Sequence, residues 1–317
     1  MKIVSLADVR RTLDSTLVVR FEMQFGRSIT DMILKNFLLE KSPVIRINTL
    51  KTDAQQIMNK LRELNVRYER VPFLPNALII GNRNEKFFED LDIYKKGEIY
   101  FQGISSQLPA LFLQPQPGEK ILDMCAAPGS KTAQIGILMQ NKGEILAMEK
   151  DQVRCERLKY NLEKQGITIA KAVMGDATFM VGEVSQSPEG VAMEFDRVLL
   201  DAPCSAEGRI DANDPRSHRF WSEKIVKEHA KLQRRLFKSG FKNLKSGGVL
   251  VYSTCTLAPE ENEGVVEWAL KEFAGQLILE KIDLDFKYKL PVTTTGTLKA
   301  MPSQISEGFF VAKFRKL

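Results

Sequence analysis

Short apolar runs alternate with amphipathic segments of helical length after about residue 118, and this alternation constrains the fold more than any other feature of the chain. The apolar runs are residues 119–125, 143–149, 195–201 and 247–255, and the helical segments that follow them are 131–140, 151–165, 222–242 and 260–273. Strands that alternate with such helices form right-handed βαβ crossovers and a mostly parallel sheet. We therefore predict a Rossmann-like α/β fold in which residues 308–317 form a final edge strand.

The first 103 residues follow a different pattern. A helical region is followed by a β-prone run, a second helical segment and two strand candidates, at residues 6–40, 43–50, about 57–64, 67–73 and 77–81. This β-α-β-β order is typical of a small α+β module, a shape common among RNA-binding proteins, although a plain structural appendage has the same propensities. We therefore expect two domains, residues 1–103 and residues 104–317.

Basic residues gather in one part of the second predicted domain. The net charge of the chain is +6, and ten Lys and Arg stand against four Asp and Glu between Arg209 and Lys242. Such a stretch can bind phosphates, and a solvated helix face explains it about equally well. Arg46 and Asn48, in the β-prone run, are further candidates for contact with a phosphate or a base.

Composition argues against several classes of protein. No apolar run reaches the roughly 18–20 residues that span a bilayer, and the N-terminus lacks the features of a secretory signal, so we expect a cytoplasmic protein without a membrane partner. The four cysteines are dispersed, none lies at CxxC spacing, and there are only two histidines. We therefore expect neither a disulfide framework nor a metal site.

The loop that follows the first predicted strand, DMCAAPGSKT at residues 123–132, has the features of a cofactor site. Its small residues Ala126, Ala127 and Gly129 allow close approach of a ligand to the backbone, and free N–H groups of the next helix can bind a carboxylate. The loop has neither a dinucleotide nor a triphosphate fingerprint. The next predicted strands end in Glu149, suited to ribose hydroxyls, and Asp176, suited to an adenine amino group. This layout favours S-adenosylmethionine.

Two cysteines follow two further predicted strands. Cys204 lies in DAPCS (201–205) and Cys255 in YSTCT (252–256), so adjacent strand ends would bring both thiols to one edge of the sheet. A thiolate that adds to carbon 6 of cytosine makes carbon 5 nucleophilic enough to accept a methyl group, which is covalent catalysis. Asp201 is placed to stabilise such an adduct at ring nitrogen 3, and the second thiol to assist product release.

Other residues have simpler interpretations. Buried cysteines usually serve packing, and we expect this of Cys125 and Cys155. Lys131 either contacts the cofactor or the base or is solvated. Pro259 and the acids after it are typical of the first turn of a helix, where they would be structural.

Several motifs occur in an order that resembles the Sun/Fmu-type family of RNA cytosine-5 methyltransferases. They are ILDMCAAPGSKT (121–132), EKD (149–151), GDA (175–177), DAPCS, YSTCT, PEENE (259–263) and GFFVAKFRK (308–316). The resemblance runs from about Ile47 to the C-terminus, and the combination of DAPCS with STCT is highly specific.

The resemblance implies a class I methyltransferase fold with a mostly parallel seven-stranded sheet. It implies that Cys255 forms the covalent bond and that Cys204 helps to release the product. It also implies a set of residues lining the S-adenosylmethionine pocket, namely Cys125, Ala126, Ala127, Pro128, Gly129, Ser130, Lys131, Glu149, Asp176 and Asp201. RIN (46–48) resembles the family's N-terminal RNA-side motif. We expect a monomer whose substrate is tRNA as the first choice and rRNA as the second.

Two departures and three alternatives accompany the resemblance. The family continues DAPCS with Gly-x-Gly, whereas Ala206 and Glu207 precede Gly208 here, and its Pro-His and Thr-Asp pairs before the last strand are absent. Enzymes that methylate an exocyclic amine need no cysteine, and a DNA cytosine methyltransferase would use Cys204 as nucleophile. A non-catalytic RNA-binding or assembly factor on the same fold would be favoured by a disrupted cofactor loop, and this loop is intact.

Overall fold

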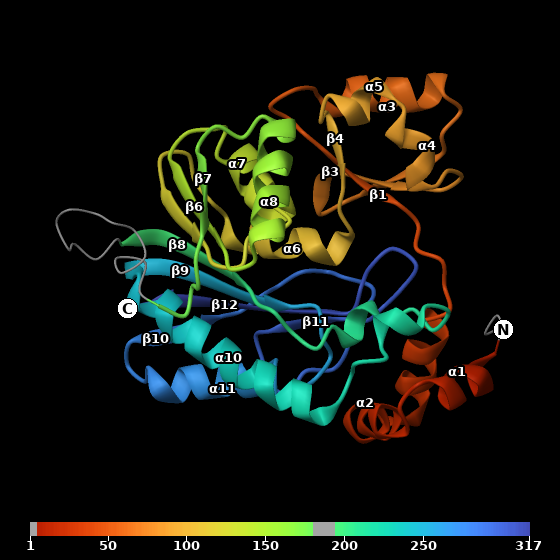
Figure 1. Cartoon of the computed structure of the whole chain (residues 1–317), viewed down its shortest axis with the longest axis vertical. Coiled ribbons are helices and arrows are strands. Elements are labelled where there is room, and N and C mark those ends of the chain that lie inside the picture. Colours follow the sequence, from red (N-terminus) through yellow and green to blue (C-terminus); the bar gives the residue numbers. More distant parts are fainter. Residues whose placement is uncertain (1–4, 180–193) are drawn as a thin grey trace.

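The computed structural model describes residues 5–179 and 194–317, in which helices cover two β-sheets (Figure 1). The smaller sheet is antiparallel and has the order β2-β3-β1-β4. Its strands and the helices that accompany them are β1 (Val44–Ile47), α3 (Ala54–Glu63), β2 (Tyr68–Val71), β3 (Leu74–Ile80), α4 (Glu85–Glu89), α5 (Asp92–Lys95) and β4 (Ile99–Phe101). The predicted β-α-β-β order is present, and β4 adds a strand that we had not predicted.

The larger sheet has the strand order β10-β12-β9-β8-β5-β6-β7, and β11 pairs with β12 outside this path. Its strands are β5 (Lys120–Asp123), β6 (Glu144–Glu149), β7 (Ala170–Met174), β8 (Phe195–Asp201), β9 (Leu244–Thr254), β10 (Leu277–Glu280), β11 (Leu298–Ala300) and β12 (Phe309–Lys316). Five neighbouring strands of this sheet, β9, β8, β5, β6 and β7, are parallel to one another. The sequence-based prediction of a Rossmann-like, mostly parallel sheet is therefore confirmed, with β11 as an eighth strand.

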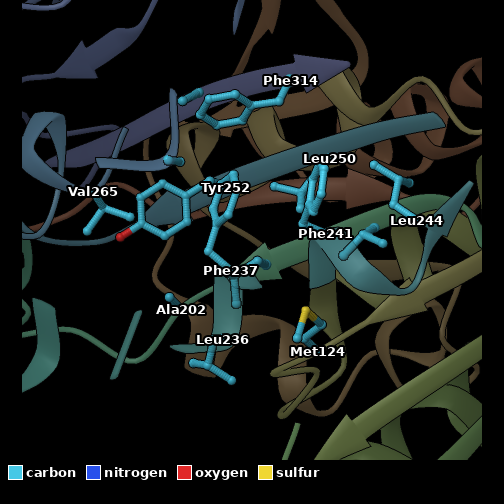
Figure 2. Close-up of a cluster of buried hydrophobic side chains, with 14 of the residues drawn as sticks. Met124, Ala202, Leu236, Phe237, Phe241, Leu244, Leu250, Tyr252, Val265 and Phe314 are labelled. Carbon is cyan, nitrogen blue, oxygen red and sulfur yellow. The ribbon is translucent and has the colours of Figure 1, made fainter. Parts of the chain in front are cut away.

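Helices cover both faces of the larger sheet (Figure 1). They are α6 (Ile104–Leu113), α7 (Ser130–Leu138) and α8 (Gln152–Gln165) on one side, and α10 (Glu223–Lys242) and α11 (Glu263–Glu272) on the other. Successive residues of a strand point to opposite faces. Leu250 and Tyr252 accordingly pack with Phe237 under α10, whereas Val249 and Val251 pack beneath α6. Figure 2 shows the first of these cores, which fixes α10 and α11 against the strands that carry the site.

The prediction of an edge strand at residues 308–317 is wrong. β12 lies inside the sheet, where it pairs with β9 along one side and with β10 and β11 along the other. Phe309, Phe310, Val311, Ala312 and Phe314 are all buried, as is typical of a strand with neighbours on both sides and helices on both faces.

The predicted helical region at residues 6–40 forms two helices, α1 (Leu6–Thr12) and α2 (Ser15–Asn36), with a break at Leu13 and Asp14. Asp14 caps α2 by accepting a hydrogen bond from the Thr16 amide. The apolar face of the pair packs on Ile210, Leu257 and Met301, beside the carboxyl ends of the central strands. No helix within residues 5–179 and 194–317 is long and apolar enough to cross a membrane.

Candidate active site

The loop between β5 and α7 is a tight turn that the sheet and α8 enclose. Gly129 has a φ of +102°, and a Cβ atom there would approach Leu158 Cδ1 to 3.0 Å, so the position favours glycine. The Arg154 guanidinium donates to the Ala127 carbonyl, and the Asn161 amide donates to the Pro128 carbonyl. The turn is thereby fixed in place, with the N-terminus of α7 at its end.

A cavity of about 450 Å³ opens where β6 and β7 end, and it fits the predicted nucleoside cofactor. Cys125, Glu149 and Asp176 line it. Glu149 is buried, and its Oε2 has no hydrogen-bond partner among the described residues, the Arg154 guanidinium being 3.4 Å away. A buried carboxylate oxygen that has only this ion-pair contact can accept a hydrogen bond, and the hydroxyls of a ribose are suitable donors.

Asp176 stands ionised at the same cavity. Burial raises its pKa, but hydrogen bonds from the Lys150 ammonium and from Thr178 outweigh burial and lower it to about 2. It is therefore an acceptor at neutral pH, which suits an adenine amino group.

A second cavity, of about 430 Å³, adjoins the first, because Cys125, Arg154 and Pro203 line both. Its wall contains most of the loop residues that the resemblance implied for the cofactor pocket: Cys125, Ala127, Pro128, Ser130 and Lys131. Ala126 and Gly129 line neither cavity and instead form the turn. Cys125, for which general cysteine behaviour predicted packing and the resemblance implied the cofactor pocket, borders both cavities, whereas Cys155 is buried in α8.

The structure brings the two predicted active-site thiols together. β8 and β9 are parallel neighbours with Asp201 opposite Ser253, so the loops that follow them leave the sheet side by side. The Cys204 and Cys255 Sγ atoms lie 3.3 Å apart in the second cavity. The hydrogen bond to Cys255, and burial after it, raise the pKa of Cys204 well above its usual value. Cys204 is therefore held as a thiol, and at this distance either sulfur can donate to the other.

Asp201 and Lys131 form an ion pair beside the thiols. The Lys131 ammonium lies 2.8 Å from Asp201 Oδ2 and also donates to Ser106 Oγ, and the Ser253 hydroxyl donates to Asp201 Oδ1. Burial lowers the pKa of Lys131, but the charge of Asp201 more than compensates and the net direction is upward. Lys131 is thus a cation held within the cavity rather than a solvated side chain.

Sequence reasoning missed one acidic residue beside the site. Residues 259–262 form a turn ahead of α11, which begins only at Glu263. Glu261 is fully buried and accepts hydrogen bonds from the Ser205 amide. The interpretation of this acid as part of a helix first turn is therefore wrong. The sequence did hold one signal for this residue: Glu261 lies six positions after Cys255, in the segment that follows the end of β9.

Arg46 and Asn48 are also not where we expected them. Both are buried: the Arg46 guanidinium donates to the Ser130 carbonyl and to Gln165 Oε1, and the Asn48 amide donates to the Gly97 and Gln165 carbonyls. These side chains join the small sheet to α7 and α8. Burial removes both side chains from the surface, although Arg46 Nε has no hydrogen-bond partner among the described residues.

The family model described as "16S rRNA methyltransferase RsmB/F" matches residues 110–315 of the chain. The chain belongs to this family. The match covers the first cavity, the loop after β5, Cys204 and Cys255, and all of the second cavity except its wall at residues 100–106. Together with the relatives, it confirms the prediction of an RNA cytosine-5 methyltransferase with a class I fold.

Relatives and solved structures agree with this assignment. The tRNA (cytosine(49)-C(5))-methyltransferase of Pyrococcus abyssi is 38% identical over 86% of the chain and 88% of its own length. The ribosomal RNA small subunit methyltransferase F of Shewanella amazonensis is 35% identical, and the match spans only 57% of that enzyme. The methyltransferase homolog protein of Pyrococcus horikoshii is 30% identical, covers 98% of both chains and has a TM-score of 0.83.

The crystal structure of NSun6 from Pyrococcus horikoshii with SFG, an analogue of S-adenosylmethionine, is also similar to this chain. It is 25% identical, it covers 97% of this chain and 99% of its own, and the TM-score is 0.84. Family and neighbour together imply that the chain uses S-adenosylmethionine. Residues 5–179 and 194–317 contain no cluster of His, Cys, Asp and Glu able to hold a metal ion.

Proposed function

We propose that this chain methylates carbon 5 of cytosine in RNA through a bond between Cys255 Sγ and carbon 6 of the base. The observation that carries the proposal is the 3.3 Å contact between the Cys204 and Cys255 sulfurs. It lies beside the Lys131–Asp201 ion pair, in a cavity that adjoins the cofactor cavity. A nucleophile, a charged pair and a methyl donor would thus meet around one pyrimidine.

Cys255 begins the reaction. Its sulfur lies within hydrogen-bonding distance of the Cys204 sulfur, and in this proposal Cys204 donates its S–H to the Cys255 thiolate that attacks the base. Addition of the thiolate forms a carbon 6–sulfur bond and moves the π electrons of the ring toward carbon 5 and nitrogen 3. The Lys131–Asp201 pair supplies hydrogen bonding or a proton at nitrogen 3, which neutralises the charge that develops there.

S-Adenosylmethionine, when bound, supplies an electrophilic methyl group to the activated carbon 5. We assign Glu149 to its ribose hydroxyls, Asp176 to its adenine amino group, and the N-terminus of α7 to its carboxylate. The loop residues Cys125, Ala127 and Pro128 would lie between the cofactor and the base, because they line the cavity that holds both thiols.

Product release breaks the carbon 6–sulfur bond once the proton on carbon 5 has left to a base. The electron pair of that carbon–hydrogen bond restores the ring double bond, and the Cys255 sulfur departs as a thiolate. We propose that Cys204 assists this step by donating its S–H to the departing sulfur. A variant without this thiol would complete methyl transfer and remain bound to the RNA.

We propose tRNA as the first substrate and rRNA as the second. The relative named as a tRNA methyltransferase is 38% identical to the chain and matches over 88% of its own length, which supports tRNA as the first choice. We also propose that residues 1–103 form a separate domain that binds the RNA. The basic side chains of α10 add to the RNA surface, since Lys224, Lys227, Lys231 and Arg235 are exposed along it.

Methyl transfer to defined RNAs tests this proposal. Purified protein is incubated with labelled S-adenosylmethionine and either total tRNA or small-subunit rRNA, and the modified cytosine is mapped by bisulfite sequencing. Label in 5-methylcytidine of tRNA is expected. Label in rRNA alone would replace the substrate and keep the chemistry, whereas label on an exocyclic amine would contradict the mechanism.

A further inference from the structure

The carboxyl group of Glu261 connects the two loops that carry the cysteines. Its residue is fully buried, and both carboxylate oxygens lie within 3.3 Å of the Ser205 amide nitrogen, directly after Cys204. Gln233 on α10 donates to Glu261 Oε2 at 2.7 Å and to the Pro203 carbonyl, directly before Cys204. The backbone on either side of Cys204 is therefore held by one buried pair.

The segment of Glu261 is in turn tied to β9, the strand that ends directly before Cys255. The Tyr252 hydroxyl donates to the Glu261 carbonyl, and Figure 2 shows this hydroxyl at the end of the core next to Val265. The Asn262 amide donates to the Thr256 carbonyl, directly after Cys255. Glu261 thus reaches from the β9 side of the site across to the Cys204 loop on the β8 side.

We infer that Glu261 is a positioning residue that holds the Cys204 thiol against Cys255. The inference rests on the proposed function for its catalytic meaning, but the contact that it explains is geometric. Burial of a carboxylate is costly unless donors satisfy it, and here the satisfied donors are those that fix the Cys204 loop. One further bond joins the two loops directly, between the hydroxyls of Ser205 and Thr256 at 2.8 Å.

Two replacements of Glu261 are expected to displace the Cys204 loop to different extents. Glu261→Gln keeps one carbonyl oxygen for the Ser205 amide but sets an NH₂ group against the Gln233 donor. Glu261→Ala leaves the Ser205 and Gln233 donors buried without a partner and frees the loop. The Cys204 thiol should therefore move away from Cys255 slightly in the first variant and more in the second.

The rate of chemical crosslinking between the two thiols measures this displacement without RNA. Diamide accepts two hydrogens and becomes a hydrazine while two thiols become a disulfide, and peptide mapping identifies the pair that forms. In the full chain, the Glu261→Ala variant is expected to form the Cys204–Cys255 disulfide about tenfold more slowly than the wild type. A displacement of about 1 Å between reacting groups can lower a reaction rate by up to about 100-fold. Glu261→Gln should lie between this variant and the wild type.

Matched controls separate positioning from misfolding. Glu260→Ala alters the neighbouring acid, which pairs with Arg20 instead, and should crosslink at the wild-type rate. Binding of S-adenosylhomocysteine by calorimetry should be unchanged in Glu261→Gln, which shows that the sheet and cofactor cavity are intact. A wild-type crosslinking rate in both Glu261 variants would overturn the inference.

The covalent RNA complex gives the catalytic readout. If Cys204→Ala accumulates a methylated protein–RNA adduct, the Glu261 variants should accumulate it too, and its absence from them would overturn the catalytic part of the inference. If Cys204→Ala itself accumulates no adduct, the proposed role of Cys204 fails. The crosslinking rates would then still decide whether Glu261 positions the thiol.

Discussion

The sulfur atoms of Cys204 and Cys255 lie 3.3 Å apart, although 51 positions of sequence separate them. The parallel pairing of β8 and β9 causes this proximity, since it sets Asp201 opposite Ser253 and directs both following loops into one cavity. The arrangement accounts for the presence of two thiols in the site. One of them is the proposed nucleophile, and the other lies within hydrogen-bonding distance of it.

The Lys131–Asp201 ion pair is expected to contribute to the chemical step more than to cofactor binding. Lys131→Met and Asp201→Asn should each lower kcat by about 10²–10⁴-fold, the usual contribution of a general acid or base. S-Adenosylhomocysteine affinity should fall much less. Single-turnover methylation assays with saturating RNA measure the effect, and Lys159→Met, on the exposed side of α8, serves as control. Wild-type turnover in Lys131→Met would remove this residue from the mechanism.

Arg46 is expected to stabilise the fold and not to bind RNA. Arg46→Ala removes the donors to the Ser130 carbonyl and to Gln165, and the loss should lower the free energy of unfolding by about 1–3 kcal/mol. Urea unfolding measures this loss. The dependence of RNA affinity on salt should stay unchanged, because that slope reports phosphate contacts. Arg70→Ala, at an exposed position of β2, should not alter stability. A shallower salt slope for Arg46→Ala, with unchanged stability, would restore the RNA hypothesis.

Stability is expected to depend on the ionisation of Asp123. Burial raises the pKa of this carboxyl from 3.8 to about 7, and the Thr132 hydroxyl donates to it. The unfolded chain releases the proton near its ordinary pKa, whereas the folded chain keeps it until about pH 7. The contribution of Asp123 to stability should therefore be greatest below its ordinary pKa and fall as pH rises through the folded value.

Asp123→Asn removes this titration, so the free energy of unfolding should decrease less between about pH 5 and pH 8 in the variant than in the wild type. Urea unfolding at the two pH values measures the difference. Glu261, whose pKa burial also raises to about 7, contributes with the same sign and remains in both proteins. Equal pH dependence of variant and wild type would contradict the buried, protonated state of Asp123.

Local rules predicted much of the fold and part of the site. Strand and helix alternation predicted the parallel half of the sheet, and the rule that parallel strands end at one edge brought Glu149, Asp176, Asp201 and the two cysteines to that edge. The position of β12 depends on pairing with β9, far away in the sequence. Its nearly continuous apolar run, FFVAKF, was nevertheless a signal for a central strand.

The errors concern side chains whose partners lie far away in the sequence. Arg46 is typical of a phosphate ligand in sequence, yet it bonds across to α7 and α8, and nothing within its own segment shows this. Glu261 likewise resembles the acids of a helix start, while its partners come from the β8 loop and from α10. Sequence periodicity indicates which face of an element is buried, but not which polar group meets which donor inside it.

A denaturing gel of covalent protein–RNA complexes tests the central claim most directly. Wild type, Cys204→Ala and Cys255→Ala are each incubated with tRNA and labelled S-adenosylmethionine, and the label is followed through the gel. The assignment of Cys255 as nucleophile and Cys204 as release thiol predicts a slow, methyl-labelled band for Cys204→Ala alone, with no methylation by Cys255→Ala. A labelled band from Cys255→Ala, or full activity of that variant, would contradict it.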